Sequence, residues 1–287
     1  MRQAIGRLLL RHARPLRDRL RDTRGTCNVC GETSRHVYNS WILPRAMTAE
    51  WRDKRVKTAF VRRESLFCHS CGSSLRVRRL VEVLIATYAP AARTLRDLVA
   101  HDEFRRLRVA EINSIGVIHP FLASHPELEY SEYRDAVDPR TPFDGVRNED
   151  VCDLSYPDES FDLVLTSDTL EHVPDFRQAF HEIRRVLKPG GRHIFTIPVI
   201  PSRRQTFARV SRGSNGERTY HLPQLFHGRG SGLLSVVSRK ADYLTWTEFG
   251  MDVIEELKSA GFKTDVHFYA DEDANADAAI VFSAEAV

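Results

Sequence analysis

The chain has 287 residues, of which 42% are hydrophobic and 28% charged, as in a soluble protein with one full domain and a smaller one. Its net charge of +3 is small, so charge alone does not indicate a nucleic-acid partner. No apolar run approaches the roughly 20 residues that span a bilayer, and the first residues show no signal-peptide pattern. We therefore expect a cytoplasmic protein without a transmembrane segment.

Residues 1–24 carry scattered leucines among many arginines, which predicts a basic amphipathic helix. Such a helix can pack on its own domain, or it can bind a membrane surface or a phosphate group. The residues do not separate these alternatives.

Four of the five cysteines form two C-x-x-C-G pairs: Cys27 with Cys30, and Cys68 with Cys71. Each pair presents two thiolates to one ion, so together they predict a closed, structural Zn²⁺ site in a ribbon over residues 25–79. A disulfide pair or a redox motif is the alternative. His36 and His69 could replace a ligand, but four cysteines suffice.

The arginine-rich segment Ser73–Arg79 leads into a predicted helix over Leu80–Tyr88, and a second helix is predicted over Thr94–Phe104. Residues 80–105 are thus expected to connect the ribbon to the main domain. The arginines either face a phosphate or acidic substrate, or they begin a solvated helix.

Strands are predicted at Arg108–Ile112, Leu128–Tyr133 and Gly145–Glu149, with a turn over Asn113–Gly116 after the first. The apolar run Phe161–Thr166 is typical of a strand buried on both faces of a parallel sheet.

A polar loop over Ser167–Val173 is followed by a helix capped by Asp175, which Lys188–Gly191 ends before a strand at His193–Ile197. A strand, a crossover helix and a parallel strand form one right-handed βαβ unit.

Residues 200–240 show no periodicity and are too long for a connector, so we expect a substrate lid inserted in the domain of residues 106–287. An amphipathic helix is predicted over Thr247–Ala260. A closing antiparallel hairpin is predicted from Phe262–Tyr269 and Ala278–Phe282.

The stretch Asp150–Pro198 contains D-L-x-x-x-P-D-x-S-F-D-L-V-L-x-x-D-x-L-E-H-V-P-D followed by E-I-x-R-V-L-K-P-G-G. It resembles the second half of a class I S-adenosylmethionine-dependent methyltransferase of the type 11 group. The resemblance implies an α/β fold with a doubly wound, mostly parallel, seven-stranded Rossmann-like sheet. A four-cysteine ribbon such as the one predicted here resembles the N-terminal module of some bacterial members.

The resemblance also implies a set of residues that bind S-adenosyl-L-methionine. Glu111 corresponds to the acidic residue at the end of the first strand, and Gly116 alone remains of the usual glycine cluster, with Asn113 as a small turn residue. Glu132, or alternatively Glu129, lies about 20 residues beyond Glu111, where such sheets place a ribose-binding carboxylate. The adenine is expected to contact Asp153 and the Leu154 amide, and Ser167 completes the set: Glu111, Asn113, Gly116, Glu132, Asp153, Leu154 and Ser167.

The predicted activity is methyl transfer to a small hydroxylated acceptor, such as a sugar or a secondary metabolite. His172 and His227 are the candidate general bases, because a neutral imidazole can remove the hydroxyl proton. One alternative is an RNA methyltransferase that grips RNA with its zinc module, although the arginine-rich N-terminus lacks interleaved aromatic residues. Another is a catalytically inactive binding protein that kept the fold.

Overall fold

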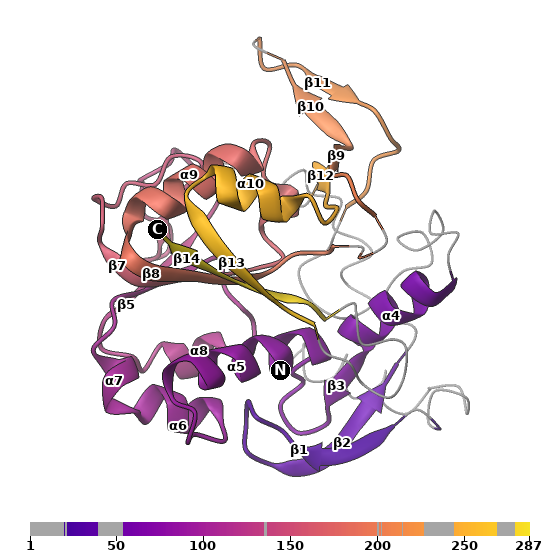
Figure 1. Ribbon diagram of the computed structural model, residues 1–287, viewed down its shortest axis with the longest axis vertical. Coiled ribbons are helices and arrows are strands. Elements are labelled where there is room, and N and C mark those ends of the chain that lie inside the picture. Colours follow the sequence, from indigo (N-terminus) through magenta and orange to yellow (C-terminus); the bar gives the residue numbers. More distant parts are fainter. Residues whose placement is uncertain are drawn as a thin grey trace.

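The computed structural model in Figure 1 describes residues 20, 22–39, 54–134, 137–199, 201, 203–213, 215–226, 244–268 and 279–287. Of the predicted basic helix over residues 1–24, only residues 20 and 22–24 are described, and Thr23 and Arg24 belong to a strand instead. His227 lies outside the described residues. Within the described residues, no helix is both long and apolar enough to span a membrane.

A seven-stranded sheet forms the centre of the molecule. Its strands are β4 (Val109–Ile112), β5 (Leu128–Glu132), β6 (Arg147–Asn148), β7 (Phe161–Ser167), β8 (Leu187–Thr196), β13 (Phe262–His267) and β14 (Val281–Ala286). They lie in the order β13-β14-β8-β7-β4-β5-β6, and only the pairings of β14 are antiparallel. The predicted doubly wound, mostly parallel sheet is therefore confirmed.

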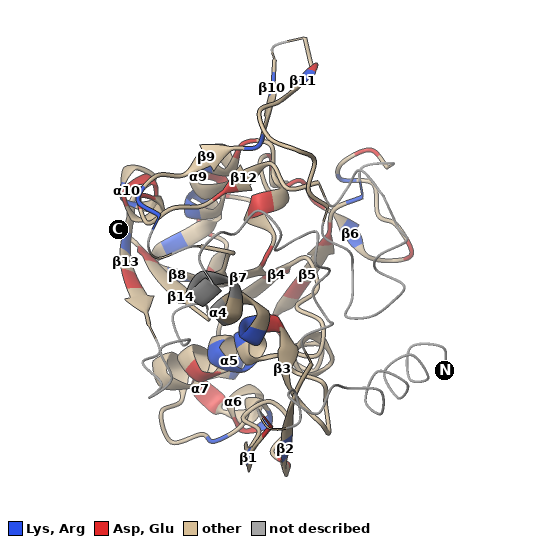
Figure 2. Cartoon of the chain, turned by 90° about the vertical axis from the view of Figure 1, so that its right-hand side faces the viewer, with Lys and Arg blue, Asp and Glu red and all other residues tan. Residues whose placement is uncertain are grey.

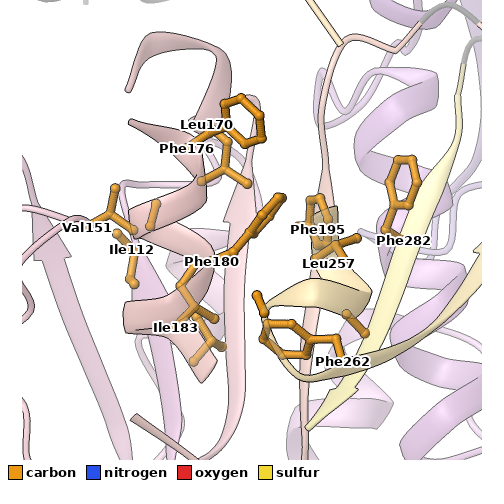
Figure 3. Packing of buried hydrophobic residues seen from close by; sticks show 14 of the residues in the cluster. Ile112, Val151, Leu170, Phe176, Phe180, Ile183, Phe195, Leu257, Phe262 and Phe282 are labelled. Atoms are coloured by element: carbon orange, nitrogen blue, oxygen red, sulfur yellow. The ribbon is translucent and has the colours of Figure 1, made fainter. Parts of the chain in front are cut away.

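Helices cover both faces of this sheet (Figure 1). One face carries α9 (Phe176–Val186) and α10 (Val253–Ser259), and the other carries α5 (Leu75–Tyr88), α6 (Leu95–Ala100), α7 (Asp102–Arg105) and α8 (His119–Leu122). Figure 3 shows the core between the sheet and the helices α9 and α10. There Phe180 of α9 approaches Phe195 of β8, and Phe195 stacks on Phe282 of β14 at 5.1 Å between ring centroids.

The helix predicted after Asp175 is present, because its apolar side chains at helical spacing are all buried and Asp175 accepts a hydrogen bond from the Gln178 amide. The helix ends at Val186 and strand β8 begins directly at Leu187, so Lys188–Gly191 lies within the strand and does not end the helix as predicted.

Two predicted helices are wrong in extent. The prediction over Thr247–Ala260 fails in its first half, since Thr247–Glu248 forms strand β12 against β9 (Phe207–Ala208) and the helix starts at Val253. The prediction over Thr94–Phe104 is interrupted at His101, whose extended backbone separates α6 from α7.

The N-terminal module consists of a three-stranded sheet and the helix α4 (Lys54–Ser65), which the sequence did not suggest. The strands are β1 (Thr23–Thr26), β2 (Thr33–Tyr38) and β3 (Leu66–Cys68). Helix α5 runs across the boundary expected near residue 80, and its apolar face shares one core with the cysteine pairs and the sheet. The module is thus packed onto the main domain rather than joined by a free connector.

In the expected lid, β10 (Val210–Arg212) and β11 (Arg218–Tyr220) form a hairpin that projects from the body of the molecule (Figure 1). Its base is fixed by the buried Arg209, which contacts Glu248 and donates a hydrogen bond to the Pro223 carbonyl oxygen at 2.6 Å.

One buried histidine predicts how stability depends on pH. His193 of β8 lies with Nε2 3.0 Å from Thr166 Oγ1, and burial lowers its pKa to about 3. The pKa of His193 is lower in the folded chain than in the unfolded chain, where it is near 6.5. The stability that the neutral, buried His193 contributes is therefore complete above pH 6.5 and is lost as the pH falls toward 3. We expect His193→Gln to reduce the acid-side loss in the free energy of unfolding by about 1.4 kcal/mol per pH unit in this window.

Urea unfolding of both proteins at several pH values measures this difference, with His181→Gln on the exposed side of α9 as the control. Parallel pH profiles for wild type and His193→Gln would contradict the prediction.

Candidate cofactor site and metal centre

The candidate cofactor site lies at the carboxyl edge of the sheet. Strands β4, β5, β6, β7 and β8 are parallel, so the residues that follow them meet at one edge, which is where open α/β sheets bind ligands. The structure brings these sequence-predicted residues to that edge: Asn113, Glu132 and Ser167.

The turn after β4 keeps its shape without the usual glycines. Asn113 takes a left-handed backbone conformation with φ of 61°, and Gly116 does so with φ of 59°. The Asn113 side chain accepts a hydrogen bond from the Tyr133 amide at 3.0 Å, which ties the turn to the end of β5. Asparagine tolerates this conformation better than other non-glycine residues, so it can serve where the family has glycine.

Glu111 orients this turn from inside the core. Its side chain is fully buried, and it accepts a hydrogen bond from the Ile115 amide at 2.8 Å. The other carboxylate oxygen lies 2.6 Å from His119 Nδ1. Burial raises the pKa of Glu111, while the His119 contact and the Ile115 amide oppose this shift. The role of Glu111 in this structure is therefore to hold the loop.

Glu132 is held in place at the end of β5. Its Oε1 accepts hydrogen bonds from the Tyr130 hydroxyl at 2.6 Å and from the Ser114 amide at 3.2 Å. The Tyr130 ring packs against the His119 ring at 4.1 Å between centroids. A pocket beside Glu132, between the ends of β5 and β6, is lined by Tyr130, Glu132, Arg134, Phe143, Asp144, Val146, Arg147 and Asn148. A carboxylate fixed in this way can accept hydrogen bonds from a ribose.

The two predicted adenine contacts, Asp153 and the Leu154 amide, have partners within the protein. The Leu154 amide already donates a hydrogen bond to Glu182 Oε2 at 2.9 Å, and the Leu154 side chain is buried in the core. Asp153 is 69% exposed and pairs with Arg140. Asp150 instead lies two residues after β6, half-buried, with its Oδ1 accepting a hydrogen bond from the Cys152 amide at 2.9 Å. Asp150 is therefore a second candidate for the adenine contact, because it lies just after the end of β6 at the ligand edge.

Ser167 and Asp168 at the end of β7 meet two arginines that the sequence did not connect to this edge. Asp168 Oδ1 lies 2.5 Å from Arg63 Nη2 of α4, and Asp168 Oδ2 lies 3.2 Å from Arg76 Nε of α5. Arg76 also donates to the Ser167 hydroxyl. The arginines of Ser73–Arg79 were expected to face an acidic substrate or solvent, and Arg76 instead pairs with carboxylates of the protein itself.

His172 ends a short 3₁₀ turn (η1, Leu170–His172) that follows Asp168. Its Nδ1 lies 3.1 Å from the Leu244 carbonyl oxygen, which can only accept, so Nδ1 carries the proton and Nε2 is the basic nitrogen. Burial lowers the pKa of His172, which favours the neutral imidazole. Nε2 lies 3.6 Å from Glu171 Oε1.

The segment after the lid covers this turn. The Trp246 amide donates a hydrogen bond to the Glu171 carbonyl oxygen at 2.7 Å. Leu244 and Trp246 therefore hold the Leu170–His172 turn from the segment that follows the lid. Within the described residues, His221 bonds Ser211 in the projecting hairpin.

The four paired cysteines form one cluster. Their sulfur atoms all lie within 4.8 Å of one another, with Cys27 and Cys71 at 3.8 Å and Cys30 and Cys68 at 3.9 Å. A tetrahedral zinc with bonds of about 2.3 Å requires sulfurs about 3.8 Å apart, whereas a disulfide requires about 2.05 Å. The donor set and its spacing thus fit Zn²⁺, and the disulfide alternative does not fit.

The two knuckles have the same backbone geometry. The amides of Gly31 and Gly72 donate to the carbonyl oxygens of Cys27 and Cys68 at 2.8 and 2.9 Å, and both glycines have φ near 80°. His36 does not join the cluster, since its Nδ1 bonds the buried Arg78 at 2.7 Å.

Comparison with known proteins agrees with this fold. Residues 124–195 match the model of a family described as a methyltransferase domain. The chain is 42% identical over 89 residues to 27-O-demethylrifamycin SV methyltransferase of Amycolatopsis mediterranei, covering 30% of this chain and 31% of that protein. It is 40% identical over 77 residues to a demethylmenaquinone methyltransferase of Clavibacter sepedonicus, covering 26% and 30%. The chain thus spans less than a third of these relatives.

A solved S-adenosylmethionine-dependent methyltransferase from Mesorhizobium loti is also similar, with 18% identity, a TM-score of 0.39, and coverage of 62% of this chain and 90% of that one.

The sheet order, the turn after β4 and the carboxylate at the end of β5 define a class I methyltransferase fold. The match of residues 124–195 to a methyltransferase domain agrees with the resemblance that the sequence motifs gave.

The cofactor contacts can be tested by binding. We expect Glu132→Ala to weaken S-adenosylhomocysteine binding by about 1.5–3 kcal/mol, the value of hydrogen bonds to a charged group. Asp150→Ala should weaken binding to a similar extent, and Asp153→Ala should have a smaller effect because its carboxylate is exposed and paired with Arg140. Calorimetric titration of the three variants measures this order, and an Asp153 effect larger than that of Asp150 would restore the original prediction.

Proposed function

We propose that the protein transfers the methyl group of S-adenosylmethionine to a hydroxyl group of a small acceptor, with His172 as the general base. The observation that carries this proposal is the hydrogen bond from His172 Nδ1 to the Leu244 carbonyl oxygen, which leaves Nε2 as the basic atom beside the strand ends. A buried, neutral histidine of this tautomer is suited to accept a hydroxyl proton.

In this proposal Glu132 and Asp150 hold the ribose and the adenine, while the Asn113–Gly116 turn faces the methionine part. S-adenosylmethionine supplies an activated methyl on a positively charged sulfur. As the acceptor oxygen forms its bond to that carbon, the hydroxyl proton passes to His172 Nε2 and the carbon–sulfur bond electrons remain on sulfur. The residues of the protein thus contribute positioning and one proton transfer.

Of the two relatives' names, that of the rifamycin enzyme specifies an oxygen acceptor, whereas that of the demethylmenaquinone enzyme does not specify oxygen. One of them acts on 27-O-demethylrifamycin SV and the other on demethylmenaquinone, and each match covers only part of both chains. We therefore propose a small hydroxylated molecule, such as a sugar or a secondary metabolite, as the acceptor class.

The first experiment is calorimetric titration of the purified protein with S-adenosylhomocysteine, followed by transfer of a radiolabelled methyl group to panels of hydroxylated small molecules and to RNA. Label recovered in a hydroxylated small molecule supports the proposal. Label recovered only in RNA would show that the acceptor is RNA and not a small molecule. A complete lack of cofactor binding would indicate an inactive binding protein.

A further inference from the structure

Two arginines join the cysteine cluster to the strand end where Ser167 lies. Arg63 precedes Cys68 by five residues, and Arg76 follows Cys71 by five residues. Arg63 lies in the last turn of helix α4, just before β3, and Arg76 lies in the first turn of helix α5, just after the second knuckle. Both arginines are therefore attached by short, structured segments to the second cysteine pair. Figure 2 shows the basic residues of α5 beside α4, in front of the central strands.

The segment between the knuckle and Arg76 is held by hydrogen bonds. The Cys68 amide donates to the Ser73 carbonyl oxygen at 2.9 Å, and Ser74 caps α5 by accepting from the Val77 amide. A displacement of Cys68 or Cys71 therefore moves the first turn of α5. The first knuckle is anchored to the same turn of α5, since Asn28 donates a hydrogen bond to the Arg78 carbonyl oxygen at 2.8 Å.

At the other end, the arginines enclose the loop after β7. Arg63 is 1% exposed and lies 2.5 Å from Asp168, while Glu64 lies 3.1 Å from Arg63 and 2.7 Å from Arg76. Asp168 has a left-handed backbone with φ of 48°, and Thr196 of β8 donates to its Oδ1 at 3.0 Å. Burial opposes ionisation of Asp168, but the charges of Arg63 and Arg76 hold its pKa well below the usual range.

We propose that the metal-bound cysteine module positions Arg63 and Arg76 against Asp168, so that metal binding and cofactor binding strengthen each other. The proposal rests on the proposed function, because it needs S-adenosylmethionine to bind at this edge of the sheet, where Ser167 is a predicted cofactor-binding residue. Removing a partner from a buried ion pair leaves an uncompensated charge, so loss of the arginine contacts rearranges the Asp168 loop rather than leaving it in place. Arg63 and Arg76 are positioning residues in this scheme.

Thermodynamic linkage supplies the test, because two coupled ligands must raise each other's affinity by the same factor. Zinc affinity is measured by competition with a chromogenic chelator, with and without saturating S-adenosylhomocysteine. We expect S-adenosylhomocysteine to tighten zinc binding by about 5–150-fold, the usual range of coupling between sites.

The variants Arg76→Ala and Asp168→Asn distinguish coupling through the arginine–Asp168 contacts from a general effect of the metal on folding. Both are expected to lose most of the coupling while still binding one zinc ion. The matched control is Arg177→Ala, which removes an arginine–carboxylate pair between α9 and α10 on the opposite face of the sheet. It should keep the coupling of the wild type.

The outcomes are distinct. If the zinc-loaded wild type does not bind S-adenosylhomocysteine, the proposed function fails. If it binds and zinc affinity does not respond, the coupling is absent and only the present inference is overturned. Coupling of wild-type size in both variants would mean that the metal acts by folding the whole chain, which also overturns the inference.

Discussion

Replacing His172 with alanine is expected to lower turnover by about 10²–10⁴-fold, the usual contribution of a general base. The affinity for S-adenosylhomocysteine should barely change, because the structure ties His172 to Leu244 and Glu171 rather than to the turn after β4. The measurement is turnover on the acceptor identified by methyl transfer, together with cofactor affinity by calorimetry. His227 was the second candidate base, and the variant His227→Ala tests that role in the same way.

The pH dependence of turnover gives a second test of His172 as the general base. Burial lowers the pKa of His172 from its ordinary value, so the neutral, active form should persist below pH 6.5, and turnover should fall only at more acidic pH. The matched control is His181→Ala on the exposed side of α9, which should leave turnover unchanged. Losses smaller than about tenfold for both His172→Ala and His227→Ala would reject histidine base catalysis.

Replacing Cys68 with serine is expected to abolish zinc binding and to destabilise the protein strongly. The reason is that Cys68 is one of four sulfurs at tetrahedral spacing, and structural zinc in small domains contributes about 10–16 kcal/mol of apparent binding free energy that is available only to the folded chain. Elemental analysis should find about one zinc ion per wild-type chain and none in the variant. The free energy of unfolding should fall with it.

Cys152→Ser is the matched control for this substitution. Cys152 is outside the cluster, and its thiol donates to the Asp175 carbonyl oxygen near α9. That variant should retain its zinc. A metal-free wild type with unchanged stability would show that the cysteine cluster does not bind a structural ion.

Local sequence patterns were sufficient where short-range forces decide the structure. The helix α9 follows from apolar residues at helical spacing behind the Asp175 cap, and β7 follows from one apolar run. The two cysteine knuckles follow from C-x-x-C-G, because the thiolates and the left-handed glycine that each turn needs lie within five residues. The same patterns were less reliable at Thr247, where pairing with β9 overrides a weak helical period.

What the sequence by itself determined is therefore the class of fold, the cysteine cluster and the strand ends that carry Glu132 and Ser167. Only the tertiary structure decided which side chains meet there. The Leu154 amide is taken by Glu182, and Arg63 and Arg76 reach Asp168 and Ser167 from 105 and 91 residues away in the chain. Such contacts depend on how helices pack across the sheet edge, and no local propensity or spacing encodes that packing.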